Sequence, residues 1–194
     1  MYKYDVQIAD QYGVMKGVQR LVFIKTGRGG TIVGHQNKYL KLAAELSART
    51  GYSVAVSANP PDLVCALPKE ISEIVAITGD PDSILFVGIS SGVLIGAQRG
   101  WMVERIRAML LINGPLMINW LKTKTGLEKF RGDTVQLIYG SLDPSAPYVG
   151  MLDRVNSNAC SYGVIEGIEH NFTNDAAFFQ HIITQFISEQ SRNS

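Results

Sequence analysis

The sequence has little net charge and no long apolar run. Its 18 Lys and Arg residues nearly balance 17 Asp and Glu residues, for a formal net charge of +1. This balance indicates no basic surface for nucleic acid or for an anionic membrane. The apolar runs are far shorter than the roughly 18 to 20 residues that span a bilayer. Residues 1–13 contain Asp5 and Asp10 and lack the apolar stretch of a signal peptide. We therefore expect a cytoplasmic protein with no membrane span and no nucleic-acid partner.

Cysteine and histidine are also scarce, with two and three residues respectively. Cys65 and Cys160 have no metal-ligand spacing, and two free thiols in a reducing compartment are the favoured interpretation. The sequence leaves open a bridge between them. Residues 27–32 lack the last glycine of G-x-G-x-x-G, and residues 29–36 lack the Lys and Ser/Thr that end a P-loop. The sequence thus indicates neither a metal nor a nucleotide cofactor.

What the chain does contain is an alternation of apolar strand-like and helix-like segments. At 194 residues and 46% hydrophobic content it is long enough for one domain, residues 1–194, with a substantial core. Strands are predicted at residues 21–24, 52–58, 84–87, 109–112, 135–139 and 162–165, after one or two edge strands within residues 1–20. Helices are predicted at residues 37–50, 69–78, 148–156 and 174–189, with another after residue 90. Residues 116–132 are predicted to form a short helical or irregular link.

This alternation predicts an α/β fold with a doubly wound, mainly parallel sheet of about six to seven strands. In such sheets ligands bind beyond the carboxyl ends of the strands. Every Gly-rich or polar loop of the chain follows a strand, so these loops are expected at that edge. The residues available for the buried face of the last helix are Ala177, Phe178, His181, Ile182 and Phe186.

The most informative stretch is residues 83–98, where an apolar strand runs through G-x-S-x-G into a helix. The motif comprises Gly88, Ser90 and Gly92. A serine on so tight a turn has strained backbone angles, and the residues two positions away on either side must be small. The turn lifts the Ser90 hydroxyl above the sheet edge. The amide of Ser91, at the start of the new helix, then points at a developing oxyanion.

A nucleophilic serine needs a base, and the base needs an acid that orients it. Of the three histidines, His35 precedes the first helix and His181 lies on the last helix. His170 follows the last predicted strand and is therefore expected at the same edge as Ser90. Asp143 ends the preceding strand and is the expected acid.

Three other carboxylates are less suitable for this role. Asp133 lies at the wrong end of its strand, Asp153 falls inside a predicted helix, and Glu169 is expected to point elsewhere.

At these residues the chain resembles the α/β-hydrolase superfamily over nearly its whole length. The order Ser90, Asp143, His170 is the family's order of nucleophile, acid and base. The segments G-x-x-D-P at residues 140–144 and G-x-x-H-x-F at residues 167–172 resemble the family's acid and histidine loops. The resemblance implies a compact α/β-hydrolase fold with a minimal lid, because residues 113–135 leave room only for a short link.

The resemblance also implies a second oxyanion donor in the loop after strand 21–24. The family has His-Gly-x-Gly there, whereas this chain has Thr26-Gly27-Arg28-Gly29-Gly30. The backbone amide of Arg28 is the expected donor. Thr26 in place of histidine puts the shape and polarity of this loop in doubt. The Arg28 side chain is favoured as a solvated loop residue, with binding of a substrate carboxylate or phosphate as the alternative.

The resulting hypothesis is a small serine hydrolase that cleaves an ester or thioester of a small acyl substrate, without a cofactor. Two alternatives stay open, namely a non-catalytic binding protein on the same scaffold and an acyltransferase that uses the same acyl-enzyme. A lidless cleft favours small or protruding substrates. Six residues follow strand ends and are candidates for the cleft, although packing is the favoured role of each: Asn59, Pro60, Leu116, Trp120, Pro147 and Tyr148.

Overall fold

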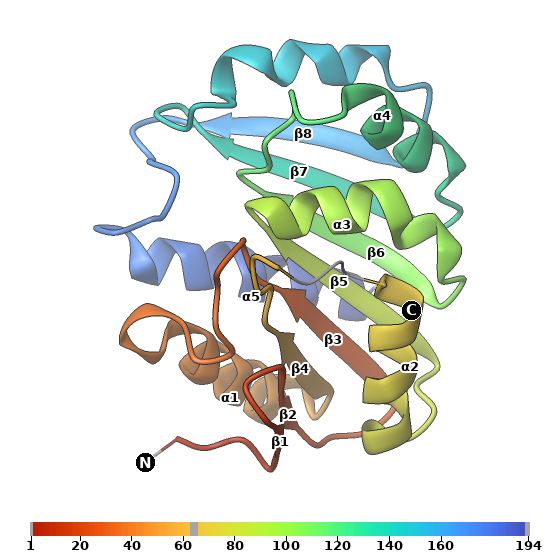
Figure 1. Cartoon of the computed structure of the whole chain (residues 1–194), viewed down its shortest axis with the longest axis vertical. Helices are drawn as coiled ribbons and strands as arrows, with labels where there is room; N and C mark the ends of the chain where they lie inside the picture. The colour runs from red at the N-terminus through yellow and green to blue at the C-terminus, as the bar shows by residue number, and fades with distance from the viewer. Residues whose placement is uncertain (1, 63–65, 193–194) are drawn as a thin grey trace.

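The computed structural model describes residues 2–62 and 66–192, and an eight-stranded sheet runs through it (Figure 1). The strands are β1 Val6–Ile8, β2 Tyr12–Met15, β3 Arg20–Lys25, β4 Ser53–Ser57, β5 Ser83–Ile89, β6 Ile106–Ile112, β7 Thr134–Gly140 and β8 Cys160–Ile165. Their order in the sheet is β1-β2-β4-β3-β5-β6-β7-β8. β2 runs antiparallel to both β1 and β4, and all other neighbours are parallel. The α/β class and the mainly parallel sheet are thereby confirmed.

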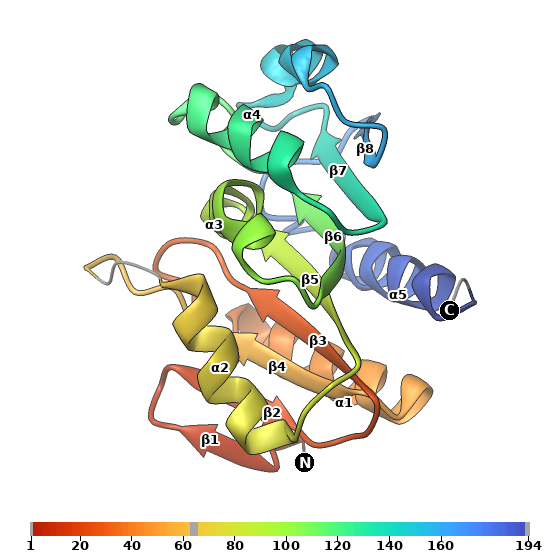
Figure 2. The same ribbon diagram turned by 90° about the vertical axis from the view of Figure 1, so that its right-hand side faces the viewer.

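Helices cover both faces of the sheet. α1 (Lys38–Thr50) and α5 (Ala176–Arg192) pack on one face, whereas α2 (Leu67–Thr78), α3 (Ser91–Arg99) and α4 (Trp120–Lys129) pack on the other (Figure 2). Three short 3-10 segments complete the described structure: η1 His35–Asn37, η2 Gly100–Met102 and η3 Ala146–Arg154. None of the helices in the described ranges is long and apolar enough to cross a membrane.

The core consists of two apolar layers because the central strands bury side chains on both faces. In β3, Val22 and Ile24 pack against α1 and α5, and Leu21 and Phe23 pack against α2 and α3. Successive side chains of a strand point to opposite faces, so a strand covered on both sides is apolar at every position. This explains why the central strands are continuous apolar runs in the sequence.

The strand count and the N-terminal edge differ from the prediction. Residues 1–20 form two strands, which gives eight strands in place of about six to seven. β2 is not an edge strand, because it lies between β1 and β4 and all four of its residues are buried.

Two helix predictions also need correction. The segment predicted as a helix at residues 148–156 is the 3-10 segment η3, in which only Leu152 is buried and Pro147 and Gly150 disfavour a longer α-helix. In α5, Ile182 and Phe186 are buried as predicted and Phe178 is half-buried, whereas Ala177 and His181 are exposed. The buried residues of α5 are Phe179, Ile182, Ile183, Thr184, Phe186 and Ile187.

The structure describes one of the two cysteines. Cys160, at the start of β8, is a half-buried free thiol, and burial raises its pKa to about 11. Cys65 lies outside the described residues, so its pairing stays untested. The prediction that residues 1–194 form one domain likewise stays a prediction.

Candidate active site

Ser90 lies on the turn that joins β5 to α3, in a strained backbone conformation with a positive φ. Its φ and ψ are 53° and −121°, a region that non-glycine residues rarely adopt. Two backbone hydrogen bonds hold the turn, because the Ser90 N–H donates to the Ile112 carbonyl (2.9 Å) and the Val93 N–H donates to the Ser90 carbonyl (2.9 Å). The serine predicted from the motif therefore lies at the carboxyl edge of the sheet.

The two flanking glycines are required by close backbone contacts. A Cβ on Gly92 would lie 2.3 Å from the Lys25 carbonyl oxygen, and a Cβ on Gly88 would lie 2.8 Å from the Gly92 carbonyl oxygen. Both distances are far inside van der Waals contact. Glycine at these positions lets α3 begin directly against the end of β3, which brings the Ser90 turn beside the loop that follows β3.

The structure brings His170 and Asp143 into one hydrogen-bonded row with Ser90. The Ser90 hydroxyl lies 3.0 Å from His170 Nε2, and His170 Nδ1 lies 2.5 Å from Asp143 Oδ2. The Asp143 side chain is 1% exposed and the His170 side chain 34% exposed. The second oxygen of Asp143 accepts the Ser145 N–H at 2.6 Å. Asp143 is thus fixed below an imidazole whose other nitrogen faces the serine.

The electrostatics of this row favour a protonated imidazole. The hydrogen bond from His170 to Asp143 raises the pKa of the imidazole above its ordinary value, although burial opposes the rise. The charges of Asp143 and Glu169 also raise this pKa, whereas the ammonium of Lys38 lowers it. Charge that develops on the imidazole would therefore be stabilised by two carboxylates.

Asn113 holds the histidine loop and the acid strand together, and the sequence analysis did not assign it a role. It lies at the end of β6, fully buried, with a φ of 52°. Its Nδ2 donates to the His170 carbonyl at 3.0 Å, and its Oδ1 accepts the Gly140 N–H at 2.9 Å. A buried Asn after a strand was the only available signal, and in a single sequence it is indistinguishable from ordinary turn chemistry.

The loop at residues 26–30 keeps its shape through Thr26 and Asn59. The fully buried Thr26 hydroxyl lies 3.2 Å from both the Gly30 and the Ser57 carbonyl oxygens. Asn59 has a buried side chain that donates to the Thr26 carbonyl (3.2 Å) and to the Ser91 hydroxyl (3.0 Å). Thr26, which stands where the family has histidine, therefore holds the loop to the end of β4 through its hydroxyl group.

Two backbone amides near the Ser90 turn, those of Ser91 and Arg28, have no backbone acceptor among the described residues. Ser91 is the first residue of α3, so its N–H has no carbonyl to bind within the helix. No backbone carbonyl of the described residues accepts the Arg28 N–H, while the neighbouring Gly29 and Gly30 N–H groups both have acceptors. A Cβ on Gly27 would lie 3.5 Å from the Ser90 hydroxyl oxygen, so this loop runs directly beside the serine.

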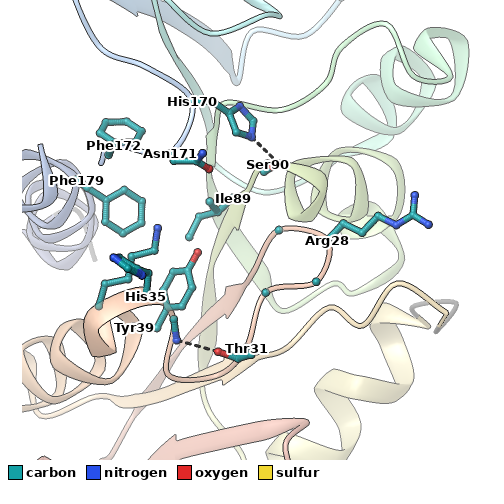
Figure 3. Close-up of a pocket in the computed structure, with 15 residues that line it drawn as sticks. Arg28, Thr31, His35, Tyr39, Ile89, Ser90, His170, Asn171, Phe172 and Phe179 are labelled. Carbon is teal, nitrogen blue, oxygen red and sulfur yellow. Dashed lines mark hydrogen bonds between the residues drawn. The ribbon is translucent and has the colours of Figure 1, made fainter. Parts of the chain in front are cut away.

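A pocket of about 460 Å³ opens beside Ser90 and His170 (Figure 3). Its walls come from the 26–30 loop, the start of α1, the histidine loop and α5. Tyr39, Phe172 and Phe179 form an aromatic wall, with ring centroids of Phe172 and Phe179 5.4 Å apart. The guanidinium of Arg28 points away from these rings (Figure 3), and the residue is exposed, as favoured from the sequence.

The other candidates lie outside the row. His35 is exposed at the rim of the pocket, and His181 is exposed on α5. Asp133 pairs with Arg107, and Asp153 accepts the Tyr162 hydroxyl. The carboxylate of Glu169 accepts backbone N–H groups of its own loop and makes no hydrogen bond to the imidazole among the described residues.

Of the candidates for the cleft, Asn59 and Pro60 line a second, smaller pocket beside Ser91, and Leu116 is in the core. The aromatic wall of the main pocket was not predicted from the sequence. Its residues lie on segments far apart in the chain, which come together only when α1 and α5 pack on the sheet.

No protein-family model matches the sequence, and no curated protein matches it either. Solved structures, in contrast, share its fold. Est1E from Butyrivibrio proteoclasticus superposes with a TM-score of 0.70 at 14% identity, covering 94% of this chain and 96% of that one. An esterase domain from Rhodothermus marinus gives 0.66 at 12% identity, covering 90% of each chain.

An α/β serine hydrolase homologue from Coxiella burnetii gives a TM-score of 0.67 at 14% identity and covers 91% of each chain. At these identities the likeness concerns the fold. Together with the strand order and the strand-to-helix turn at Ser90, it shows that this chain has the α/β-hydrolase fold.

Proposed function

We propose that the protein is a serine hydrolase that cleaves a carboxylic ester or thioester through an acyl-enzyme on Ser90. The observation that carries this proposal is the row Ser90 Oγ–His170 Nε2–His170 Nδ1–Asp143 Oδ2, with distances of 3.0 and 2.5 Å. Such a row is the arrangement that activates a serine hydroxyl, because the base lies within reach of its proton and is oriented by a carboxylate.

In the first half-reaction the Ser90 oxygen attacks the acyl carbon while His170 Nε2 takes the hydroxyl proton. The carbonyl electron pair moves to oxygen, and the amides of Ser91 and Arg28 stabilise the oxyanion. When the intermediate collapses, the bond to the alcohol or thiol breaks, and His170 returns its proton to the leaving group. Asp143 stabilises the imidazolium throughout and keeps its Nδ1 proton directed at the carboxylate.

In the second half-reaction water replaces the leaving group. His170 takes a proton from water, the resulting hydroxide attacks the acyl carbon, and the second intermediate collapses to release the acid and the Ser90 hydroxyl. The comparisons with esterases support ester substrates, since Est1E and the Rhodothermus marinus domain share the fold. We place this activity in the cytoplasm and expect a small acyl compound as substrate.

The loop with Thr26 does not favour the alternative of a non-catalytic scaffold. Hydrogen bonds from Thr26 hold the loop to Gly30 and Ser57, and no backbone carbonyl of the described residues accepts the Arg28 N–H. A loop that covered Ser90, or whose amides were all hydrogen-bonded within the protein, would instead have supported a binding protein without turnover.

The test is hydrolysis of 4-nitrophenyl butyrate and butyryl thioesters by the wild type, Ser90→Ala and His170→Ala. We expect both variants to lose about three or more orders of magnitude in kcat while their thermal unfolding stays close to wild type. Product analysis with added alcohols and amines separates hydrolysis from acyl transfer. Retention of wild-type turnover by both folded variants would disprove the proposal.

A further inference from the structure

The pocket beside Ser90 is lined by cations and aromatic rings. Its charged or titratable lining residues are Arg28, His35, Lys38, Tyr39 and His170, and no Asp or Glu of the described residues lines it. Arg28 points away from the aromatic wall (Figure 3) and His35 is exposed at the rim. The proposed mechanism uses His170 as the base. Lys38 is therefore the cation of this pocket that has no assigned role.

The ammonium of Lys38 is held against two aromatic rings. Its Nζ lies 5.2 Å from the ring centroid of Tyr39 and 5.1 Å from that of Phe179. The negative faces of these rings attract a cation and fix the side chain at the pocket wall. Across residues 2–62 and 66–192, none of the ion pairs involves Lys38.

A half-buried ammonium without a counter-ion gains from the arrival of an anion. Burial lowers the pKa of Lys38, and the charge of Glu169 opposes this effect. Glu169 does not line the pocket, and its carboxylate accepts the backbone N–H groups of Asn171 (3.2 Å) and Thr173. The carboxylate of Glu169 is thus engaged by its own loop, and an anion in the pocket would supply the counter-charge that Lys38 lacks.

Part of the pocket wall is apolar. Ile89, Phe172 and Phe179 are all buried and all line the pocket. At about 460 Å³ the pocket has the size of a site for a small organic molecule. Its chemistry fits a ligand with a short apolar chain and an anionic group at the end.

We propose that Lys38 binds an anionic group of the substrate, so that the protein acts on esters or thioesters that carry a carboxylate or phosphate beyond a short apolar chain. This inference rests on the proposed hydrolysis at Ser90 and assigns its substrate class. Lys38 acts as a specificity-determining residue, since its charge selects the anionic member of a pair of otherwise similar esters.

The test compares matched ester pairs in wild type, Lys38→Met and the control Lys122→Met. In the first pair the anion is on the acyl side, with mono-4-nitrophenyl glutarate against its methyl-capped diester. In the second it is on the alcohol side, with the butyryl ester of 3-hydroxybenzoate against that of methyl 3-hydroxybenzoate. Methionine keeps the apolar stem of lysine without its charge. Lys122 is exposed on α4, so its substitution changes the net charge equally.

The measured quantity is the ratio of kcat/KM for the anionic ester to kcat/KM for the neutral one. We expect this ratio to fall about tenfold in Lys38→Met for at least one pair, the size typical of a hydrogen bond to a charged group. It should stay unchanged in Lys122→Met. Equal ratios in wild type and Lys38→Met for both pairs, and for phosphate analogues of them, would overturn the inference.

A binding measurement separates this inference from the proposed function. Calorimetric binding of monomethyl glutarate and of butyl phosphate to Ser90→Ala is compared with binding to Ser90→Ala/Lys38→Met. We expect the second protein to bind about tenfold more weakly in at least one case. Lys38-dependent binding in a protein whose wild type has no turnover would support the anion site and disprove the hydrolase. Turnover in the wild type, with kcat/KM ratios and binding that do not change in Lys38→Met, would support the hydrolase and disprove the anion site.

Discussion

For single residues, the proposed mechanism depends on the protonation state of His170. In that mechanism the imidazole must be neutral to accept the serine proton, and its hydrogen bond to Asp143 raises its pKa above the ordinary value of 6.5. The fraction of neutral His170 therefore increases as the pH rises through this elevated pKa. We predict that kcat/KM rises with pH along an acid limb centred above pH 6.5, measured with a neutral ester.

Two substitutions should move this acid limb in opposite directions. Asp143→Asn removes the charge and the acceptor that stabilise the imidazolium, so the limb should move to lower pH while kcat falls by roughly three to four orders of magnitude. Lys38→Met removes a cation that lowers the His170 pKa, so the limb should move to higher pH. A limb that shifts in neither variant would show that His170 does not titrate as described.

Two buried asparagines, Asn113 and Asn59, hold the loops of the site in place and do not themselves act on substrate in the proposed mechanism. The Asn113 amide bridges the His170 carbonyl and the Gly140 N–H, and the Asn59 amide joins Thr26 to Ser91. Both are buried, so each hydrogen bond is made away from water, where its loss leaves an unsatisfied group. They are positioning residues for the histidine and for the oxyanion loop.

At the scale of elements, the site requires α3 to start against the end of β3. A Cβ on Gly92 would lie 2.3 Å from the Lys25 carbonyl, and neither backbone can move without disturbing the Ser90 turn. We predict that Gly92→Ala lowers the free energy of unfolding by about 1–3 kcal/mol and lowers kcat more than it raises KM.

The matched control for Gly92→Ala is Gly150→Ala in η3, where a new Cβ meets no atom within 4 Å. Denaturant unfolding and ester kinetics on both variants make the comparison. Equal behaviour of the two variants would show that the contact of α3 with β3 does not constrain the serine.

A second element-scale contact joins α2 to the end of β3. The Lys25 ammonium, 1% exposed, lies 2.8 Å from Glu70 Oε2, 2.9 Å from the Ser57 hydroxyl and 2.7 Å from the Ala58 carbonyl oxygen. Removing one member of a buried ion pair leaves the other charge uncompensated, which costs about 3–5 kcal/mol. We predict a loss of this size in Glu70→Leu, measured by denaturant unfolding.

The double variant Lys25→Met/Glu70→Leu provides the control. With both charges replaced by apolar side chains, stability should return to within about 1–2 kcal/mol of wild type. A double variant as unstable as Glu70→Leu would show that the pair stabilises this edge by more than charge compensation. Lys25 immediately precedes the oxyanion loop, so activity in the double variant also reports whether the pair positions that loop.

At the scale of the whole molecule, the sheet brings together loops that are far apart in the chain. Ser90, Asp143 and His170 each follow a different parallel strand, and the carboxyl ends of parallel strands share one edge. This rule made the three residues predictable from sequence, because strand identity and direction could be inferred from apolar runs and Gly-rich ends. The order of these three residues along the chain is also what made the sequence resemble the α/β-hydrolase family.

The pocket could not be predicted in the same way. Its aromatic wall joins Tyr39 on α1 to Phe179 on α5, and their contact, with ring centroids 6.3 Å apart, depends on how two helices pack on the sheet. The predicted buried face of α5 included the exposed Ala177 and His181 and left out Phe179, which is buried. Lys38 was not singled out from the sequence, because its contacts with the rings of Tyr39 and Phe179 exist only in the folded chain.

Whether Ser90 is an activated nucleophile can be tested by labelling with a fluorophosphonate, with the modified residue located by mass spectrometry. We expect one phosphonylated residue, Ser90, in the folded wild type. Labelling should be lost in Ser90→Ala and in a heat-denatured sample, and it should be strongly slowed in His170→Ala. Folded wild-type protein that resists the reagent, or that is labelled at another serine, would contradict the claim that Ser90 is an activated nucleophile.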